Sequence, residues 1–161
     1  MMNNNKIKRI DQEIGDQSGE AICLINIADA YSTLEKYDLA IENAEKSLAI
    51  NKKVCDKQGI SQSLIHIGAI YQKKEKFEDA ISIYESALII CEEINNRPSI
   101  STIHNNLGSI YQNNKKKEYE KAIYHLLWSV ALDTQMKVKK IPAYTWIEAI
   151  RNEIGLAILG I

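Results

Sequence analysis

Apolar residues recur three and four positions apart along almost the whole chain, which is the spacing of one face of an α-helix. The pattern predicts helices near residues 6–14, 18–34, 37–54, 58–74, 77–94, 98–114, 118–136 and 144–160. Short polar stretches, such as 34–36 and 74–76, separate neighbouring helices, so consecutive helices should be antiparallel. Glycine and proline, at 7 and 2 residues, are too rare for a β-sandwich or barrel of many strands. We expect an all-α fold.

The same pattern returns every 40 residues. Residues 15–54 and 55–94 share 13 identities over 40 positions, including Tyr31 with Tyr71 and Gly19 with Gly59. A third copy over residues 95–136 has two extra residues in the turn within 113–118. Residues 6–14 resemble the end of a preceding second helix, and residues 137–161 the start of a fourth copy. We expect one repeat domain over residues 1–161, with Asp16 and Asp56 capping the helices that follow them.

The register of the last copy has two solutions. Residues 154–158 resemble residues 67–71, which puts Gly155 in place of Gly68 and makes residues 144–160 a fourth first helix. A rival register puts Trp146 at the large aromatic position, but it would place Ile150 where a small residue is needed. We prefer the register with Gly155.

Each copy carries a recurrent motif on both of its helices. The first helices contain Leu24-x2-Ile27-Ala28-x2-Tyr31, Leu64-x2-Ile67-Gly68-x2-Tyr71 and His104-x2-Leu107-Gly108-x2-Tyr111; the second contain Ala40-x3-Ala44, Ala80-x3-Tyr84 and Ala122-x3-Leu126. These motifs resemble the tetratricopeptide repeat, with a 40-residue period similar to that of kinesin light chains and many bacterial regulatory proteins. Lys52, Glu92 and Thr134 stand where the family has a proline. The resemblance implies an α-solenoid, a right-handed superhelix of antiparallel helix pairs whose first helices line a concave groove.

The resemblance also implies which residues face the groove. They lie on the first helices, six and three positions before and one and four after the small residue, with a second row two before it. The predicted groove residues are Ile22, Ile25, Asn26, Asp29, Gln62, Ile65, His66, Gln72, Thr102, Asn105, Asn106, Ser109 and Gln112, with Ser32 and Ala69 in the same rows. In peptide-binding relatives, asparagines of the second row hydrogen-bond the backbone of an extended ligand. Asn26 and Asn106 match that row and His66 departs from it; the alternative is that these polar residues only face water.

One ligand class of the family is disfavoured. Relatives that hold a terminal carboxylate use a clamp of Lys or Arg with Asn. Here Ile25 and Asp29 stand at the positions of a lysine and an asparagine, and Thr102 and Asn106 replace the cations of the third repeat. A carboxylate next to Asp29 would be repelled, so we expect no such clamp.

No pattern of catalytic, cofactor-binding or metal-binding residues is present. The chain has no glycine-rich phosphate loop, HExxH or nucleophile elbow. His104 occupies a packing position, and His125 is expected to lie far from the other two histidines, so no zinc site can be assembled. Cys23, Cys55 and Cys91 are odd in number and have no CxxC spacing, which favours a reducing compartment, the cytoplasm. We expect no enzyme activity, no cofactor and no metal.

Charge and hydropathy narrow the classes of molecule that could be the partner. Residues 1–94 carry 16 acidic and 11 basic groups, whereas residues 95–161 carry 5 and 9. The basic half lacks the dense basic face with aromatic platforms of a nucleic-acid binder. No run approaches 18 apolar residues, so no segment is predicted to span a membrane. We expect a protein or peptide as the partner.

Two functions remain open. The first is a non-catalytic interaction module that binds a peptide or helix of another protein in its groove. The second is a structural or regulatory segment of a longer signalling protein, which acts by oligomerisation or conformational relay. The last eight residues contain no charge, and Leu156 and Leu159 lie off the face that would pack on the third repeat. The second function therefore includes a homodimer through the carboxyl-terminal helix.

Overall fold

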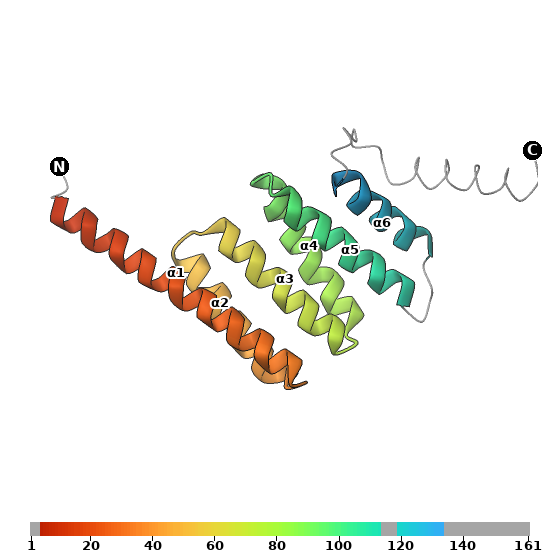
Figure 1. Cartoon of the computed structure of the whole chain (residues 1–161), viewed down its shortest axis with the longest axis horizontal. Coiled ribbons are helices and arrows are strands. Elements are labelled where there is room, and N and C mark those ends of the chain that lie inside the picture. Colours follow the sequence, from red (N-terminus) through yellow and green to blue (C-terminus); the bar gives the residue numbers. More distant parts are fainter. Residues whose placement is uncertain (1–3, 114–118, 134–161) are drawn as a thin grey trace, which may run out of the picture. The chain divides into compact units, whose positions relative to one another are not determined.

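The computed structural model describes residues 4–113 and 119–133, which form six helices (Figure 1). They are α1 (Asn4–Thr33), α2 (Tyr37–Lys53), α3 (Lys57–Lys73), α4 (Phe77–Glu93), α5 (Arg97–Asn113) and α6 (Tyr119–Asp133). The all-α class is confirmed, and the bounds of α2 to α5 lie within one residue of the predicted ones. The chain forms two compact units, residues 1–99 and residues 100–161. The predicted helix 144–160 and its dimer contact lie outside the described residues.

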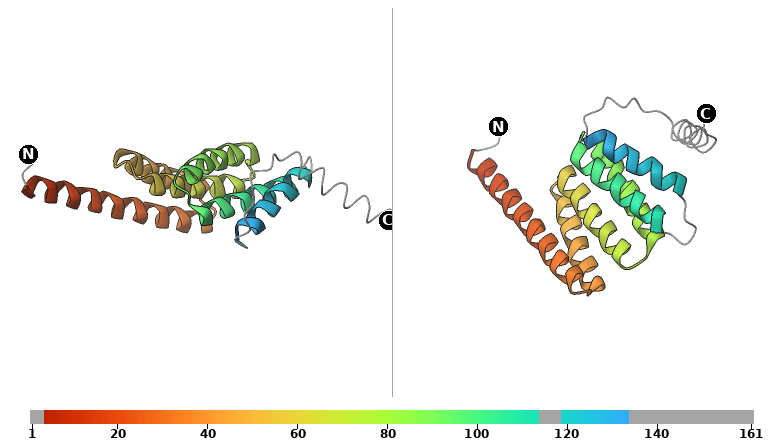
Figure 2. Two further views of the ribbon diagram at one scale, coloured as in Figure 1. Left: turned by 90° about the horizontal axis from the view of Figure 1, so that it is seen from above. Right: turned by 45° about the vertical axis from the view of Figure 1, so that its right-hand side comes forward.

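The predicted break between helices 6–14 and 18–34 is wrong, because α1 runs without interruption from Asn4 to Thr33. Its amino-terminal half extends beyond the end of α2 (Figures 1 and 2). Gly15 and Gly19 lie inside it, and a Cβ atom added to either would meet nothing within 4 Å. Extending an existing helix adds one hydrogen bond per residue, whereas a separate helix of nine residues would bear a new nucleation cost. Continuation is therefore favoured despite the two glycines.

The turns between helices repeat every 20 residues in the first unit. Glu35, Cys55, Glu75 and Asn95 each have φ between 54° and 58°, the left-handed region. In each turn the next residue donates its backbone N–H to the carbonyl five residues earlier, as Lys36 does to Tyr31 at 2.9 Å. This is the Schellman arrangement, built here without glycine. The regular turn gives every helix pair the same antiparallel geometry.

Small residues allow the helices of the first unit to approach closely. Ala28, Ala40 and Ala44 are fully buried and pack with Ile67 and Ile70. A Cβ on Gly68 would lie 2.8 Å from Cε1 of Tyr84, a fully buried ring on α4. The glycine of the repeat motif therefore leaves the space that this tyrosine ring fills.

The second unit has the same helix-pair arrangement. Ser101 contacts Ser129, and His104 contacts His125 further along. A Cβ on Gly108 would lie 2.8 Å from Cγ of Leu126. The same Cβ would lie 3.3 Å from the carbonyl oxygen of Ala122. The partner number falls from 129 at Ser101 to 122 at Gly108, so α5 and α6 are antiparallel.

Equivalent positions of the repeat differ in burial at the amino-terminal edge. Ile67 on α3 is 3% exposed, because its face packs on α2. Ile27, at the same repeat position on α1, is 44% exposed. Cys23 and Ala30 are exposed as well, whereas their counterparts Ser63 and Ile70 are buried. This face of α1 is therefore uncovered by the described residues.

The difference in burial predicts a difference in stability between two otherwise equal substitutions. Ile67→Ala should lower the free energy of unfolding by about 2–5 kcal/mol, because it removes buried methyl groups and leaves a cavity. Ile27→Ala should cost no more than about 1 kcal/mol, because much of that side chain already contacts water. Denaturant titration of both variants measures the contrast. Equal losses would mean that the face of α1 is covered in solution.

Candidate functional site

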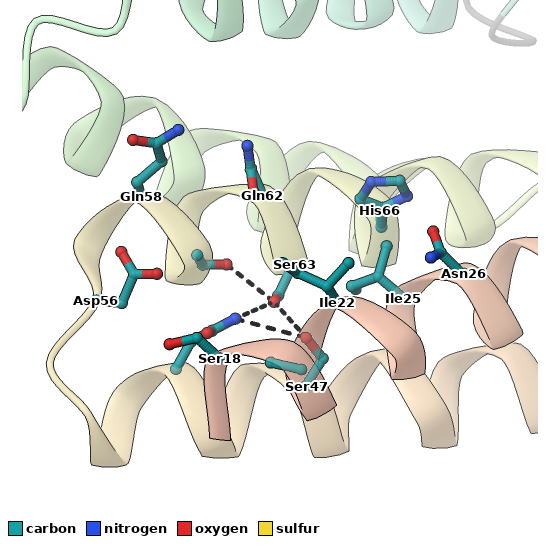
Figure 3. A pocket seen from close by; sticks show the side chains of 13 residues that line it. Ser18, Ile22, Ile25, Asn26, Ser47, Asp56, Gln58, Gln62, Ser63 and His66 are labelled. Atoms are coloured by element: carbon teal, nitrogen blue, oxygen red, sulfur yellow. Dashed lines mark hydrogen bonds between the residues drawn. The ribbon is translucent and has the colours of Figure 1, made fainter. Parts of the chain in front are cut away.

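A pocket of about 280 Å³ lies between α1, α2 and α3, all in the first unit (Figure 3). Five predicted groove residues line it: Ile22, Ile25, Asn26, Gln62 and His66. The other lining residues are Ser18, Ala21, Ser47, Asn51, Asp56, Gln58, Gly59 and Ser63. The volume lies just below the range of small-molecule sites, about 300–1,000 Å³, so it suits one or two peptide side chains.

The pocket borders a buried polar network (Figure 3). Ser63 donates its hydroxyl to the carbonyl of Gly59 at 2.9 Å, and its oxygen lies 3.1 Å from that of Ser47. Asn51 donates its amide to Ser63 Oγ at 3.1 Å. All three side chains are buried. Because their polar atoms are already satisfied, the network joins α2 to α3 and holds the pocket wall in place.

The outer wall of the pocket is a mixture of apolar and amide side chains from α1 and α3. Ile22 is 62% exposed, so a ligand can contact it directly. Ile25 is half-buried and packs on the core. Asn26 and Gln62 are exposed. The wall therefore offers an apolar contact next to hydrogen-bonding groups, the composition of a site that binds a peptide.

Two contacts join the first helices α1 and α3 beside the pocket. His66 Nδ1 lies 2.9 Å from Asp29 Oδ1, and because a carboxylate only accepts, the histidine donates. Lys73 Nζ donates to Ser32 Oγ at 3.1 Å. Asp29 and Ser32, both predicted to face the groove, therefore hold the two helices side by side.

The prediction that Asp56 caps α3 is wrong. Asp56 occupies the N-cap position, but its side chain makes no capping hydrogen bond. Instead its carboxylate lies over Gly59, where a Cβ would be 2.6 Å from Oδ2. The same added atom would be 2.6 Å from Cγ of Asn51, so only glycine fits here. This close packing leaves the Asp56 carboxylate at the end of the pocket.

The other predicted groove residues are not in this pocket. Ile65 is half-buried, and Gln72 accepts a hydrogen bond of 3.2 Å from the hydroxyl of Tyr84. That bond ties Gln72 to α4, so its side chain supports the core. The remaining five lie on α5 in the second unit, where Thr102, Asn105 and Gln112 are exposed and Asn106 and Ser109 are half-buried.

The expectation that groove residues lie on the first helices missed part of the pocket. Ser47 and Asn51 belong to a second helix, and Asp56 and Gln58 to the link and first turn of α3. One signal was present in the sequence: Ser47 and Asn51 align with Ala87 and Cys91 one repeat later. Polar residues at buried positions of a helix need partners, and here they find each other and Ser63.

The prediction that His125 lies far from the other histidines is wrong for His104. Their Nδ1 atoms are 2.8 Å apart, so one nitrogen donates and the other accepts. His104 stacks on Trp128 and His125 on Tyr111, with ring centroids 5.6 and 5.5 Å apart. Burial lowers the pKa of both histidines to about 4, and for His125 the charges of His104 and Lys121 add to the effect. The pair is neutral at pH 7.

Other titratable groups show no cluster of the kind that binds metal. Within residues 4–113 and 119–133, no group of three or more His, Cys, Asp or Glu side chains could hold an ion. Cys23 and Cys55 are exposed, whereas burial raises the pKa of the Cys91 thiol. In the same part of the chain, no helix has the length and apolarity to cross a bilayer.

Comparisons with known proteins identify the family. Residues 59–135 match a family model described as the tetratricopeptide repeat, and residues 21–54 match a second model with the same description. The matches identify the family as a whole and no subgroup within it. Comparison with curated proteins gave no match. Repeats of this family are non-catalytic modules for protein interaction. The chain therefore belongs to the tetratricopeptide repeat family, and its helix pairs form the α-solenoid of that family.

Proposed function

We propose that this protein is a non-catalytic interaction module that binds an extended peptide of a partner protein along α1 and α3. The observation that carries the proposal is the pocket, where the exposed apolar side chain of Ile22 lies with the exposed amide groups of Asn26 and Gln62. An apolar contact supplies affinity, and amides hydrogen-bond the backbone of an extended chain whatever its side chains are.

An extended peptide fits this surface better than a helix does. A docked helix satisfies its own backbone groups and needs a continuous apolar groove. The pocket wall instead alternates Ile22 and Ile25 with Asn26, Gln62 and His66. The satisfied network of Ser47, Asn51 and Ser63 keeps the wall rigid, so little conformational entropy is lost on binding.

The alternative proposal is a structural or regulatory segment that acts by oligomerisation. The uncovered face of α1 favours it, because Ile27 is exposed where its counterpart Ile67 is buried. A dimer through residues 144–160 remains a prediction, since that segment lies outside the described residues. Self-association measured by light scattering on Ile27→Glu and on the unchanged chain would support this alternative if the substitution abolished it.

Removal of the exposed isoleucine should weaken binding without loss of stability. Peptides selected from a randomised library against the purified protein serve as ligands. Ile22→Ala should lower their affinity about fivefold or more, because a central apolar contact is lost. Asn26→Ala should also lower the affinity, and Asn26→Ala with Asn106→Ala tests the two asparagines of the predicted second row. Fluorescence anisotropy gives the affinities and thermal denaturation the stability.

Ile89→Ala is the matched control, because Ile89 is 68% exposed on the second helix α4, close to the 62% of Ile22. It should leave affinity unchanged. If Ile22→Ala and Ile89→Ala behaved alike, the pocket would not be the binding site. We place the protein in the cytoplasm, a location that the number and spacing of its cysteines support.

A further inference from the structure

The pocket has a carboxylate at one end. Asp56 lies there, and Asn26 and His66 lie at the other end (Figure 3). Among the described residues, none donates a hydrogen bond to the Asp56 carboxylate, and α3 does not use it as a cap. A carboxylate only accepts hydrogen bonds, so a donor group of a ligand can replace water on this half-buried side chain.

The nearest cation in the sequence, Lys57, lines a separate pocket with Asp56 and Gln58. None of the described residues that line the pocket between α1, α2 and α3 is Lys or Arg. Lys57 follows Asp56 directly, but its Nζ donates to the carboxylate of Glu93. Residues 1–94 as a whole carry 16 acidic against 11 basic groups. The end of the pocket is therefore suited to a positive group and unsuited to a carboxylate.

Amide and hydroxyl groups surround the carboxylate. Gln58 and Gln62 lie along one side of the pocket, and Ser18 lies across from them (Figure 3). Their oxygens add acceptors beside Asp56, while Ala21 and Ile22 offer apolar contact for an aliphatic stem. A guanidinium group has five donors in one plane on such a stem, whereas an ammonium group has three around a point.

We propose that this pocket binds an arginine side chain of the peptide ligand, with Asp56 as the counter-charge. The inference rests on the proposed function, because it names the side chain that anchors the extended peptide. The guanidinium group lies against Asp56, with the oxygens of Gln58 and Gln62 as further acceptors. The peptide backbone then runs from this end toward Asn26.

The test compares selected peptides with a matched pair of protein variants. Randomised peptides selected against the unchanged protein should be enriched in arginine at one position. Asp56→Asn should weaken the selected peptide about tenfold, because it removes the charge and keeps the shape. Citrulline, a neutral isostere of arginine, should cause the same loss in the peptide. The two changes together should cost little more than either alone, as expected for a directly coupled pair.

Asp16→Asn is the control, since Asp16 holds the position of Asp56 one repeat earlier and is exposed outside the pocket. It should leave affinity unchanged. Asp56→Asn should melt like the unchanged protein, because no capping bond is lost and asparagine suits an N-cap. Peptides that need Ile22 but tolerate Asp56→Asn and citrulline would overturn the arginine site and leave the proposed function intact. Selected peptides that are indifferent to Ile22, Asn26 and Asp56 would overturn both.

Discussion

Gly68→Leu is expected to destabilise the first unit by at least about 3 kcal/mol, the upper part of the range for over-packed cores. The first atom of the new side chain would already lie 2.8 Å from Cε1 and 2.9 Å from Cδ1 of Tyr84. That ring cannot move aside easily, because it is fully buried and its hydroxyl donates to Gln72. The helices α3 and α4 would have to separate. Thermal and denaturant unfolding followed by circular dichroism measure the loss.

Gly19→Ala is the control for the helix propensity of glycine. Gly19 lies inside α1 with open space around its Cα, so alanine should stabilise the chain by up to about 1 kcal/mol. Gly68→Ala should instead be destabilising, since the same gain in propensity is outweighed by the contact with Tyr84. An unchanged melting curve for Gly68→Leu would show that the repeat register, and with it the predicted groove, is wrong.

Stability of the second unit is expected to fall as the pH drops from 6.5 toward 4. Burial lowers the pKa of His104 and of His125 from 6.5 to about 4 in the folded chain. Between these values the unfolded chain takes up protons that the folded chain does not, so the folded state loses free energy relative to it. Above pH 6.5 the two histidines are neutral in both the folded and the unfolded chain, so their effect on stability no longer changes with pH. One pKa unit corresponds to about 1.4 kcal/mol, so the loss is on the order of 3 kcal/mol for each histidine.

The hydrogen bond explains why a second proton is resisted. With the two Nδ1 atoms 2.8 Å apart, one proton lies between the rings. The donor ring can take up a proton at Nε2 and keep this bond, but protonation of both rings would place two donors against each other. Fluorescence of Trp128, which stacks on His104, can follow unfolding at each pH once Trp146 is replaced by phenylalanine.

The variant His104→Phe/His125→Phe keeps aromatic rings beside Trp128 and Tyr111 but cannot titrate. Its stability should therefore depend less on pH over this interval than that of the unchanged chain. His66→Gln is the matched control, because His66 is only half-buried and belongs to the other unit. Equal pH profiles for the double variant and the unchanged chain would contradict a role for the buried pair.

The periodicity of the sequence was sufficient to predict the bounds of α2 to α5 and five of the residues that line the pocket. Helix bounds and turns follow from local rules, the three-and-four spacing and a turn that recurs every 20 residues. The 40-residue alignment then placed Ile22, Asn26 and Gln62 on first helices, and these residues do line the pocket. The alignment also identified Gly68 as the small residue of the motif, and the structure places the ring of Tyr84 against it.

Only the tertiary structure decided which residues from different helices meet. Ser47 and Asn51 enter the pocket wall because α2 packs against α3, and His125 meets His104 because α5 and α6 are antiparallel and in register there. The continuity of α1 follows from the cost of starting a new helix, and the exposure of Ile27 depends on what packs beside it. Repeat identity alone reveals neither. Local sequence determines where a helix begins and ends, because its hydrogen bonds join residues four apart. Pairing between helices depends on side chains distant in sequence. The same motif position can therefore be buried in one repeat and exposed in another.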